Sequence, residues 1–229
     1  MKIFLVAACL FLGLFGRSAS LLEENCGTAL RSSRFRRLVG GHEAVSLAHP
    51  WMVMVHRDSM YVCGGSLITS RFVLTSAQCL NAGKPMYAHD CCIASPFKDL
   101  FLPICLSVTQ RLERVQSYTI TGWGTKGDNV LARILQETTL LGDDPLLCKS
   151  ETHYQIDQSQ ICTSGLNGDS CYGDAGGPLS ADLFYNGTKR VFLMGILSFG
   201  SFDCKGYSVS TYVPHYRDWI KDTIKQNLN

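Results

Sequence analysis

A glycine-rich stretch, GDSCYGDAGGPL at residues 168–179, constrains the fold of this 229-residue chain more than any other segment. Gly173, Gly176 and Gly177 have no Cβ, so the backbone there can turn sharply and approach a ligand or another strand closely. The same stretch carries two acids and a cysteine. A sharp turn of this kind can bind an oxyanion through its backbone N–H groups. The stretch therefore predicts a rigid turn that faces a ligand.

Length and composition limit the classes of protein to consider. The length fits one large or two small all-β domains, and 46% hydrophobic residues are enough to fill a core. The net charge is +2 and no basic run exceeds the cluster Arg34, Arg36 and Arg37, which excludes nucleic acid and anionic membranes as partners. There is no CxxC pair with a matching downstream pair or HxxxH, so we expect no metal. Nothing in the sequence points to a cofactor.

Residues 1–20 have the pattern of a secretory signal peptide. Lys2 precedes an apolar run from Ile3 to Phe15, and small residues at 18–20 follow where a signal peptidase would cut. A membrane-spanning helix is the alternative, but it needs about 20 apolar residues. Of the 11 cysteines, Cys9 would leave with the signal, and the remaining ones suit an oxidising compartment. We therefore expect a secreted, extracellular protein.

Two motifs give the chain a family resemblance. The glycine-rich turn resembles the GDSGGP turn of chymotrypsin/trypsin-family serine proteases, in which the attacking serine occupies the position of Ala175. FVLTSAQC at 72–79 is similar to the family's WVLTAAHC, and Gln78 stands where the family has its general-base histidine. A methyl group cannot attack a carbonyl, and a glutamine amide does not titrate near neutral pH. The resemblance therefore implies a protease scaffold with two catalytic positions replaced.

The third catalytic group of the family, an aspartate, is not identifiable. The family's PICL segment is present at 103–106, but an ungapped count from it puts Pro85 at the aspartate position, and the neighbours of Asp90 do not match. Only about 25 residues separate Cys79 from Cys105, which is too few for three strands of about 5 to 6 residues with their turns. We expect a first barrel that lacks elements, either as a truncated fold or as the product of a shortened splice form or faulty gene model.

The resemblance covers residues 38–229 and implies an all-β fold, a trypsin-like double β-barrel with a truncated N-terminal barrel and a C-terminal helix. Apolar runs predict buried strands at 51–56, 66–70 and 191–199, with Gly64 and Gly65 separating the first two, and apolar alternation predicts a strand at 135–141. Asp143 or Asp144 before Pro145 predicts a helix start. Tyr216, Trp219, Ile220 and Ile224 recur at the spacing of a C-terminal helix that packs on the barrel.

Residues 21–37 resemble an activation peptide. Arg37 followed by LVGG from Leu38 is similar to the R/IVGG junction that trypsin-like enzymes cut in zymogens of the family, although a solvated basic loop is the alternative. After cleavage, the new α-amino group of Leu38 would fold inward and pair with Asp174. The resemblance thus implies a conformational switch that persists without the chemistry.

Family disulfide pairing accounts for eight cysteines. The resemblance implies the pairs Cys26–Cys105, Cys63–Cys79, Cys148–Cys162 and Cys171–Cys204, of which the first would tether the N-terminal peptide to the domain. Cys91 and Cys92 have no assigned partner.

A specificity pocket is also implied. Asp169 precedes Ala175 by the spacing at which trypsin-like enzymes keep the acid at the pocket floor, although an exposed loop aspartate is the alternative. Ser198, Phe199 and Gly200 would form one wall, and Ser208 would replace a glycine of the second wall and narrow the cavity. The backbone N–H groups of Gly173 and Ala175 could still form an oxyanion hole. The resemblance therefore implies a pocket that binds an arginine or lysine side chain of a peptide.

These observations support a non-catalytic serine protease homologue. We expect a secreted binding or regulatory module in extracellular proteolysis, whose partners are proteins or peptides with basic residues, including a protease of an extracellular cascade. An active endopeptidase that cuts after arginine or lysine is the alternative, with new chemistry from a pair such as His89 and Asp90; a non-functional truncated product is another. Asn186, in the sequence Asn-Gly-Thr, predicts an N-glycosylation site in a polar turn.

Overall fold

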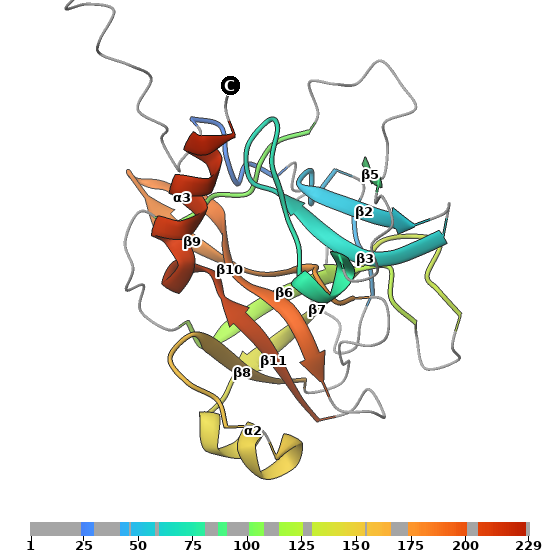
Figure 1. Ribbon diagram of the computed structural model, residues 1–229, viewed down its shortest axis with the longest axis vertical. Coiled ribbons are helices and arrows are strands. Elements are labelled where there is room, and N and C mark those ends of the chain that lie inside the picture. Colours follow the sequence, from blue (N-terminus) through green and yellow to red (C-terminus); the bar gives the residue numbers. More distant parts are fainter. Residues whose placement is uncertain are drawn as a thin grey trace, which may run out of the picture.

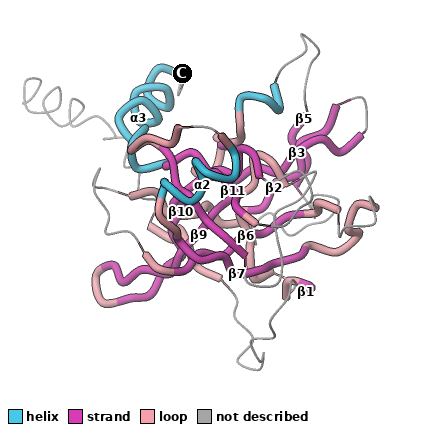
Figure 2. Tube along the Cα trace, turned by 90° about the horizontal axis from the view of Figure 1, so that it is seen from below, coloured by secondary structure: helices cyan, strands magenta, loops and turns pink. Residues whose placement is uncertain are grey.

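The computed structural model describes residues 24–29, 42–45, 47–57, 60–80, 87–90, 101–107, 115–125, 130–153, 155–165, 174–200 and 206–227. These residues form two sheets with short helical segments around them (Figure 1). In Figure 2 magenta strands run through the described chain, and the cyan helices are confined to short stretches. The expected all-β fold is confirmed.

The larger sheet closes into a barrel. Its strands are β1 (His42–Glu43), β6 (Ser117–Gly122), β7 (Gln136–Gly142), β8 (Gln160–Gly165), β9 (Pro178–Tyr185), β10 (Thr188–Gly200) and β11 (Tyr207–Tyr212). The order is β1-β7-β6-β9-β10-β11-β8, and a further antiparallel pairing of β7 with β8 closes all of these strands except β1 into a six-stranded barrel, while β1 pairs with β7. Closure removes the exposed edges that an open sheet would leave.

The smaller sheet contains β2 (Met52–Arg57), β3 (Met60–Leu67), β4 (Val73–Leu74) and β5 (Tyr87–Asp90), in the order β4-β3-β2-β5. Among the described residues it is an open sheet of four strands, in accord with the truncated N-terminal barrel that the short Cys79–Cys105 interval predicts. One detail of the prediction is wrong: Gly64 and Gly65 do not separate two strands but lie inside β3. Gly64 makes a close contact with the glycine-rich turn that is described below, and a Cβ on Gly65 would lie 3.0 Å from the Val73 side chain of β4.

Helical segments lie between and after the strands. They are η1 (Ala77–Leu80), α2 (Pro145–Thr152), η3 (Val213–Tyr216) and α3 (Arg217–Gln226). Asp144 caps α2, as one of the two predicted positions, because its carboxylate accepts a hydrogen bond from the Leu146 N–H at 2.8 Å. No helix in the described part of the chain has the length and apolar character needed to cross a membrane.

The C-terminal helix α3 docks through two residues and not four. Ile220 and Ile224 are buried, whereas Trp219 and Tyr216 are 62% and 39% exposed. The prediction that all four pack on the barrel is therefore wrong for the two aromatic residues. Trp219 precedes Ile220 by one residue and so lies on a different face of α3, and Tyr216 lies in η3, before α3 begins. Aromatic character alone did not mark the core face.

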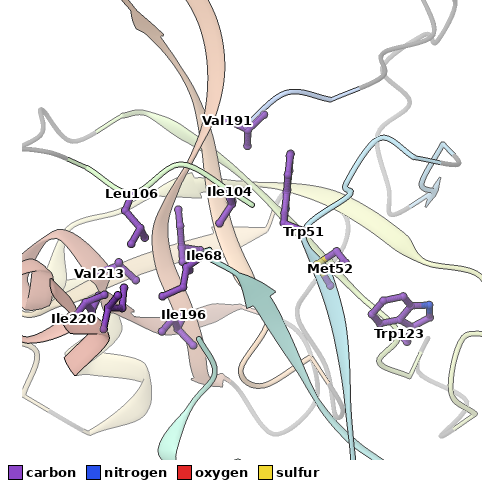
Figure 3. Packing of buried hydrophobic residues seen from close by; sticks show 12 residues of the cluster. Trp51, Met52, Ile68, Ile104, Leu106, Trp123, Val191, Ile196, Val213 and Ile220 are labelled. Atoms are coloured by element: carbon purple, nitrogen blue, oxygen red, sulfur yellow. The ribbon is translucent and has the colours of Figure 1, made fainter. Parts of the chain in front are cut away.

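A single apolar cluster joins the two sheets. It combines Trp51, Met52 and Ile68 from the smaller sheet and its flanks, Leu193 and Ile196 from β10, Ile104 and Leu106 from the connecting segment, and Val213, Ile220 and Ile224 from the C-terminal helices. Figure 3 shows these side chains meeting between the strands and α3. The C-terminal helix therefore stabilises the junction of the two halves and not one half alone. A second cluster, with Leu140, Leu179 and Met194, fills the closed barrel.

The structure contains the disulfides Cys26–Cys105, Cys63–Cys79 and Cys148–Cys162, the pairings that the resemblance implied. Cys91, Cys92, Cys171 and Cys204 lie outside the described residues. Three covalent links in the described part of the chain are typical of a protein that folds in an oxidising compartment.

Candidate functional site

The end of the glycine-rich stretch forms a tight turn against β10. The Gly177 N–H donates to the Asp174 carbonyl at 3.0 Å and closes the turn. The Gly176 N–H donates to the Leu197 carbonyl at 2.9 Å, and the Leu197 N–H donates back to the Gly177 carbonyl at 3.0 Å. Gly176 has φ +80°, a conformation in which a side chain is strained. The backbone around Ala175 is thus held on both sides.

The smaller sheet approaches this turn through Gly64. The Gly64 N–H donates to the Ala175 carbonyl at 3.0 Å, and the Thr75 hydroxyl donates to the Gly64 carbonyl at 2.8 Å. A Cβ on Gly64 would lie 3.0 Å from the Gly177 Cα, and one on Gly176 would lie 2.3 Å from the Thr75 Oγ1. Only glycines permit so close a contact, so these positions set how the two halves meet.

Gln78 lies at the same place, where the smaller sheet meets the turn around Ala175; we call this place the Ala175 corner. It belongs to η1, which the Cys63–Cys79 disulfide fixes to β3, and the Cys79 Sγ lies 3.9 Å from the Ala175 carbonyl oxygen. The Gln78 side-chain Nε2 donates a hydrogen bond of 2.9 Å to the Ser198 carbonyl of β10. The structure therefore brings together Gln78, Ala175 and Ser198, three residues that the sequence assigned to one site. What it presents there is an amide donor and a methyl group.

The Asp174 side chain points away from Gln78 and packs against Gly122 and Gly124 of the TGWG segment, which form a seat for its carboxylate. Its Oδ1 accepts a hydrogen bond of 2.9 Å from the Gly124 N–H. A Cβ on Gly122 would lie 2.0 Å from Oδ1, and one on Gly124 would lie 2.5 Å from the Asp174 carboxyl carbon. Both glycines are thus required to leave room for the carboxylate. The sequence identified the TGWG segment but not this use of its glycines.

Tyr61 of β3 is a member of the site that the sequence analysis missed. Burial of its phenol is the main cause that raises its pKa above the ordinary value of 10.0, and the nearby Asp174 carboxylate raises it further, while a backbone hydrogen bond from Trp123 opposes the shift. The rings of Tyr61 and Trp123 meet edge to face at 6.3 Å. A tyrosine just before the Cys63-Gly64-Gly65 segment of a buried strand was the available signal.

The expected pocket residues are only partly within the described chain. Ser198 and Gly200 lie near the end of β10, and Gly200 pairs with Ser208 of β11. Ser208 is 5% exposed, and its hydroxyl is 2.9 Å from the Thr163 hydroxyl.

Several other predicted site residues lie outside the described residues. They are Asp169 and Gly173 of the glycine-rich stretch and Arg37 and Leu38 of the activation junction. His89 and Asp90 end β5 opposite Met54 and Val53. No group of three or more potential metal ligands occurs among the described residues.

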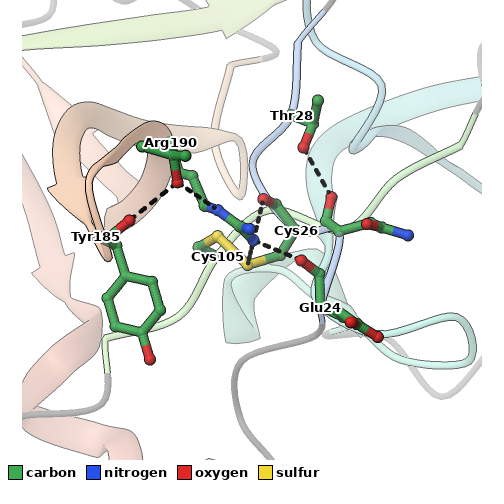
Figure 4. Close-up of a disulfide and its surroundings, with 8 residues drawn as sticks. Glu24, Cys26, Thr28, Cys105, Tyr185 and Arg190 are labelled. Carbon is green, nitrogen blue, oxygen red and sulfur yellow. Dashed lines mark hydrogen bonds between the residues drawn. A yellow bond between two sulfur atoms is a disulfide. The ribbon is translucent and has the colours of Figure 1, made fainter.

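The N-terminal segment 24–29 is attached to the start of β10 (Figure 4). Besides the Cys26–Cys105 disulfide, the Gly27 N–H donates to the Pro103 carbonyl at 2.8 Å, and the Gly27 carbonyl accepts from the Val191 N–H at 3.0 Å. The Arg190 guanidinium donates to the Glu24 carbonyl at 2.7 Å. Covalent and hydrogen bonds thus hold the same short peptide.

Known proteins with similar sequences are serine proteases. Serine protease grass of Drosophila melanogaster is 26% identical over 274 residues, which cover 90% of this chain and 72% of that protein. Transmembrane protease serine 11G of Rattus norvegicus is 29% identical over 248 residues, covering 88% of this chain and 58% of that protein. Melanization protease 1 of Drosophila melanogaster is 26% identical over 278 residues, covering 89% of this chain and 68% of that protein. The alignments are longer than this chain of 229 residues, so each relative has segments without a counterpart here.

The family model described as Trypsin matches residues 38–90 and 92–220. The match is in two parts, and its break at Cys91 falls inside the short interval between Cys79 and Cys105. The first part covers the open sheet with Gln78, and the second covers the closed barrel with Ala175. The chain therefore belongs to the trypsin family, the chymotrypsin/trypsin-like serine proteases.

Proposed function

We propose that this chain is a catalytically silent member of the trypsin family that acts outside the cell as a binding or regulatory module in proteolysis. The observation that carries the proposal is the hydrogen bond from Gln78 Nε2 to the Ser198 carbonyl, close to the turn that contains Ala175. A glutamine amide does not titrate near neutral pH, so Gln78 cannot take a proton from a nucleophile, and its side chain is bonded to the scaffold instead. Ala175 supplies no nucleophile to activate.

The expected loss of chemistry is large. In subtilisin, removal of the catalytic serine or histidine alone lowers turnover by about 10⁶-fold. A small rate enhancement over water remains, which comes from the oxyanion hole and substrate binding. A site with neither group has no route to an acyl-enzyme. We therefore expect no detectable peptide hydrolysis from the corner formed by Gln78 and Ala175.

Binding of a basic peptide segment is the function that such a scaffold can keep. In this proposal the Asp169 carboxylate receives an arginine or lysine side chain, Ser198 and Gly200 flank it, and the backbone N–H groups of Gly173 and Ala175 hold a carbonyl of the same peptide. The Ser198 carbonyl accepts a hydrogen bond from Gln78, which changes the surroundings of the proposed catalytic positions. In this proposal the part of β10 that would line the pocket is unaffected. A protease of an extracellular cascade, or its substrate, is the partner that this chemistry would recognise.

The activation junction is part of the proposal. Cleavage after Arg37 would release the α-amino group of Leu38, which would pair with Asp174 as the switch between two conformations. The seat formed by Gly122 and Gly124 supports this, because it holds the Asp174 carboxylate in a fixed orientation. Residues 1–20 would direct the chain to the secretory pathway, and the three disulfides support an oxidising compartment.

Two assays separate the proposal from its alternatives. The secreted protein, before and after treatment with trypsin, is incubated with a labelled fluorophosphonate and with an arginyl peptide substrate, and we expect neither labelling nor turnover. Binding of an immobilised, non-cleavable arginyl peptide is then compared among wild type, Asp169→Asn and Asp222→Asn, an exposed acid of α3 that serves as the control. We expect Asp169→Asn to weaken binding by about tenfold or more, which is about 1.4 kcal/mol, and Asp222→Asn to leave it unchanged.

Each alternative has its own signature. Covalent labelling with turnover identifies an active endopeptidase that uses a different catalytic arrangement. A chain without a cooperative melt and without protected amides identifies a non-functional truncated product. A folded, unlabelled protein that binds the peptide equally well with Asp169→Asn would keep the catalytic silence and overturn the pocket.

A further inference from the structure

The hairpin between β9 and β10 ends in a tight turn that projects into solvent. Its central residues Asn186 and Gly187 have φ +48° and +76°, the left-handed values of a type I′ turn, for which Asn-Gly is the preferred sequence. Tyr185 and Thr188 form the pair that closes the turn, and the Thr188 hydroxyl donates to the Tyr185 carbonyl at 2.9 Å. The turn is therefore well formed and its side chains have defined directions.

The two faces of this hairpin differ in character. The Tyr185 ring lies 6.3 Å from the buried Phe192 ring, so it faces the barrel core. Phe184 faces outward and is 81% exposed, more than any other large hydrophobic side chain in the described part of the chain. It pairs across the strands with Lys189, which also forms a salt bridge of 3.1 Å with Asp182. The outer face is thus an aromatic ring bordered by one cation and one anion.

Space for a bulky group exists beside this ring. A Cβ added to Gly187 would meet no atom within 4 Å, and Asn186 is exposed. Asp182 and Phe184 are two residues apart in β9, which places both on its outer face, and Asn186 follows as the first residue of the turn. The segment Asn186–Thr188 is also an N-glycosylation sequon.

We propose that Asn186 carries an N-linked glycan whose first N-acetylglucosamine packs on the ring of Phe184. One face of this sugar presents only C–H bonds, and these are attracted to the electron-rich face of an aromatic ring. Lys189 and Asp182 supply a donor and an acceptor for the hydroxyl groups at the edge of the sugar. The glycan explains why a phenylalanine is exposed on the outer face of β9 beside the charged side chains of Asp182 and Lys189.

The test uses the full chain secreted from mammalian cells with uniform high-mannose glycans. One sample is treated with an endoglycosidase that leaves a single N-acetylglucosamine, and another with an amidase that removes the whole glycan and converts Asn186 to aspartate. We expect the single-sugar form to melt about 2 °C or more above the sugar-free form, because the sugar that touches Phe184 is the first one. Ring currents of Phe184 should also shift the N-acetylglucosamine protons upfield in the wild-type NMR spectrum.

Matched variants separate the contact from the turn. Phe184→Ser keeps the sequon, and we expect its single-sugar and sugar-free forms to melt together. Asn186→Asp removes the sequon but keeps the Thr188 hydroxyl with its hydrogen bond to the Tyr185 carbonyl, and it has the same sequence as the amidase product, so it should melt like the sugar-free wild type. The upfield shift in wild type keeps the proposal testable if Phe184→Ser is not secreted.

Three results would overturn the proposal. They are a chain that enters the secretory pathway without a glycan on Asn186, equal melting of the two wild-type forms, and a melting difference that persists in Phe184→Ser. The inference rests on the proposed secretion but not on catalytic silence, so a protein that reacts with fluorophosphonate would leave it standing.

Discussion

At the scale of single residues, the corner around Ala175 lacks a nucleophile and a base together. Restoring a serine without a histidine, or a histidine without a serine, should therefore give little reactivity toward a fluorophosphonate. We expect Ala175→Ser to react with a fluorophosphonate at least about 10²-fold more slowly than the double variant Gln78→His/Ala175→Ser, the range that a positioned general base contributes. Gln78→His alone is the control without a nucleophile. Equal labelling of the single and double serine variants would mean that residue 78 does not face the hydroxyl.

Tyr61 gives the same region a sensitivity to alkaline pH. Its folded-state pKa is raised, first by burial and then by the Asp174 carboxylate, so the folded protein disfavours the tyrosinate. The stability that this group contributes is therefore complete below its unfolded pKa of about 10 and is lost above it, at about 1.4 kcal/mol per pH unit.

Tyr61→Phe removes this dependence. We expect the free energy of unfolding of wild type to fall more steeply above about pH 10 than that of Tyr61→Phe, as measured by denaturant titrations at a series of pH values. Tyr216→Phe, on the surface of the C-terminal segment, is the control because Tyr216 is 39% exposed. Parallel curves for wild type and Tyr61→Phe would contradict the buried phenol.

At the scale of elements, two glycines with similar backbone conformations have different surroundings. Gly176 and Gly187 have φ +80° and +76°, but a Cβ on Gly176 would lie 2.5 Å from the Gly64 carbonyl, whereas one on Gly187 meets nothing within 4 Å. We expect Gly187→Ala to cost about 1 to 2 kcal/mol, the penalty of the left-handed conformation alone. Gly176→Ala should cost clearly more, since backbone must move. Denaturant midpoints compare them directly, and equal losses would show that the contact with β3 yields easily.

Elements with local signals could be predicted from the sequence, and those that depend on tertiary contact could not. The apolar run at 191–199 became β10, and Asp144 before Pro145 began α2, because each is decided by neighbouring residues. The prediction that Gly64 and Gly65 separate two strands is wrong because it relied on the low strand propensity of glycine, whereas Gly64 lets β3 approach the turn and Gly65 lies against Val73 of β4. The resemblance located Gln78 and Ala175, but no local pattern could reveal the Gln78–Ser198 hydrogen bond, whose residues are 120 apart.

At the scale of the whole molecule, one core and one disulfide connect parts that are distant in sequence. The shared cluster places α3 against residues of both sheets, so packing on the closed barrel and α3 adds to the stability of the open sheet. The bond after Arg37 lies between Cys26 and Cys105, so a cut there would divide the chain while the disulfide still joined its pieces. In the proposed activation, cleavage after Arg37 and release of the N-terminal peptide would therefore be separate events.

This separation gives a direct test. After trypsin cleaves the secreted protein, we expect one band on a non-reducing gel and two on a reducing gel, with Leu38 as the new N-terminus. In Cys26→Ser/Cys105→Ser the peptide is held only by contacts such as those of Gly27 and Arg190, so it should elute separately after dilution and gel filtration. Cys148→Ser/Cys162→Ser removes a disulfide elsewhere and should retain the peptide. Loss of the peptide from cleaved wild type, or no cut after Arg37, would contradict a tethered activation peptide.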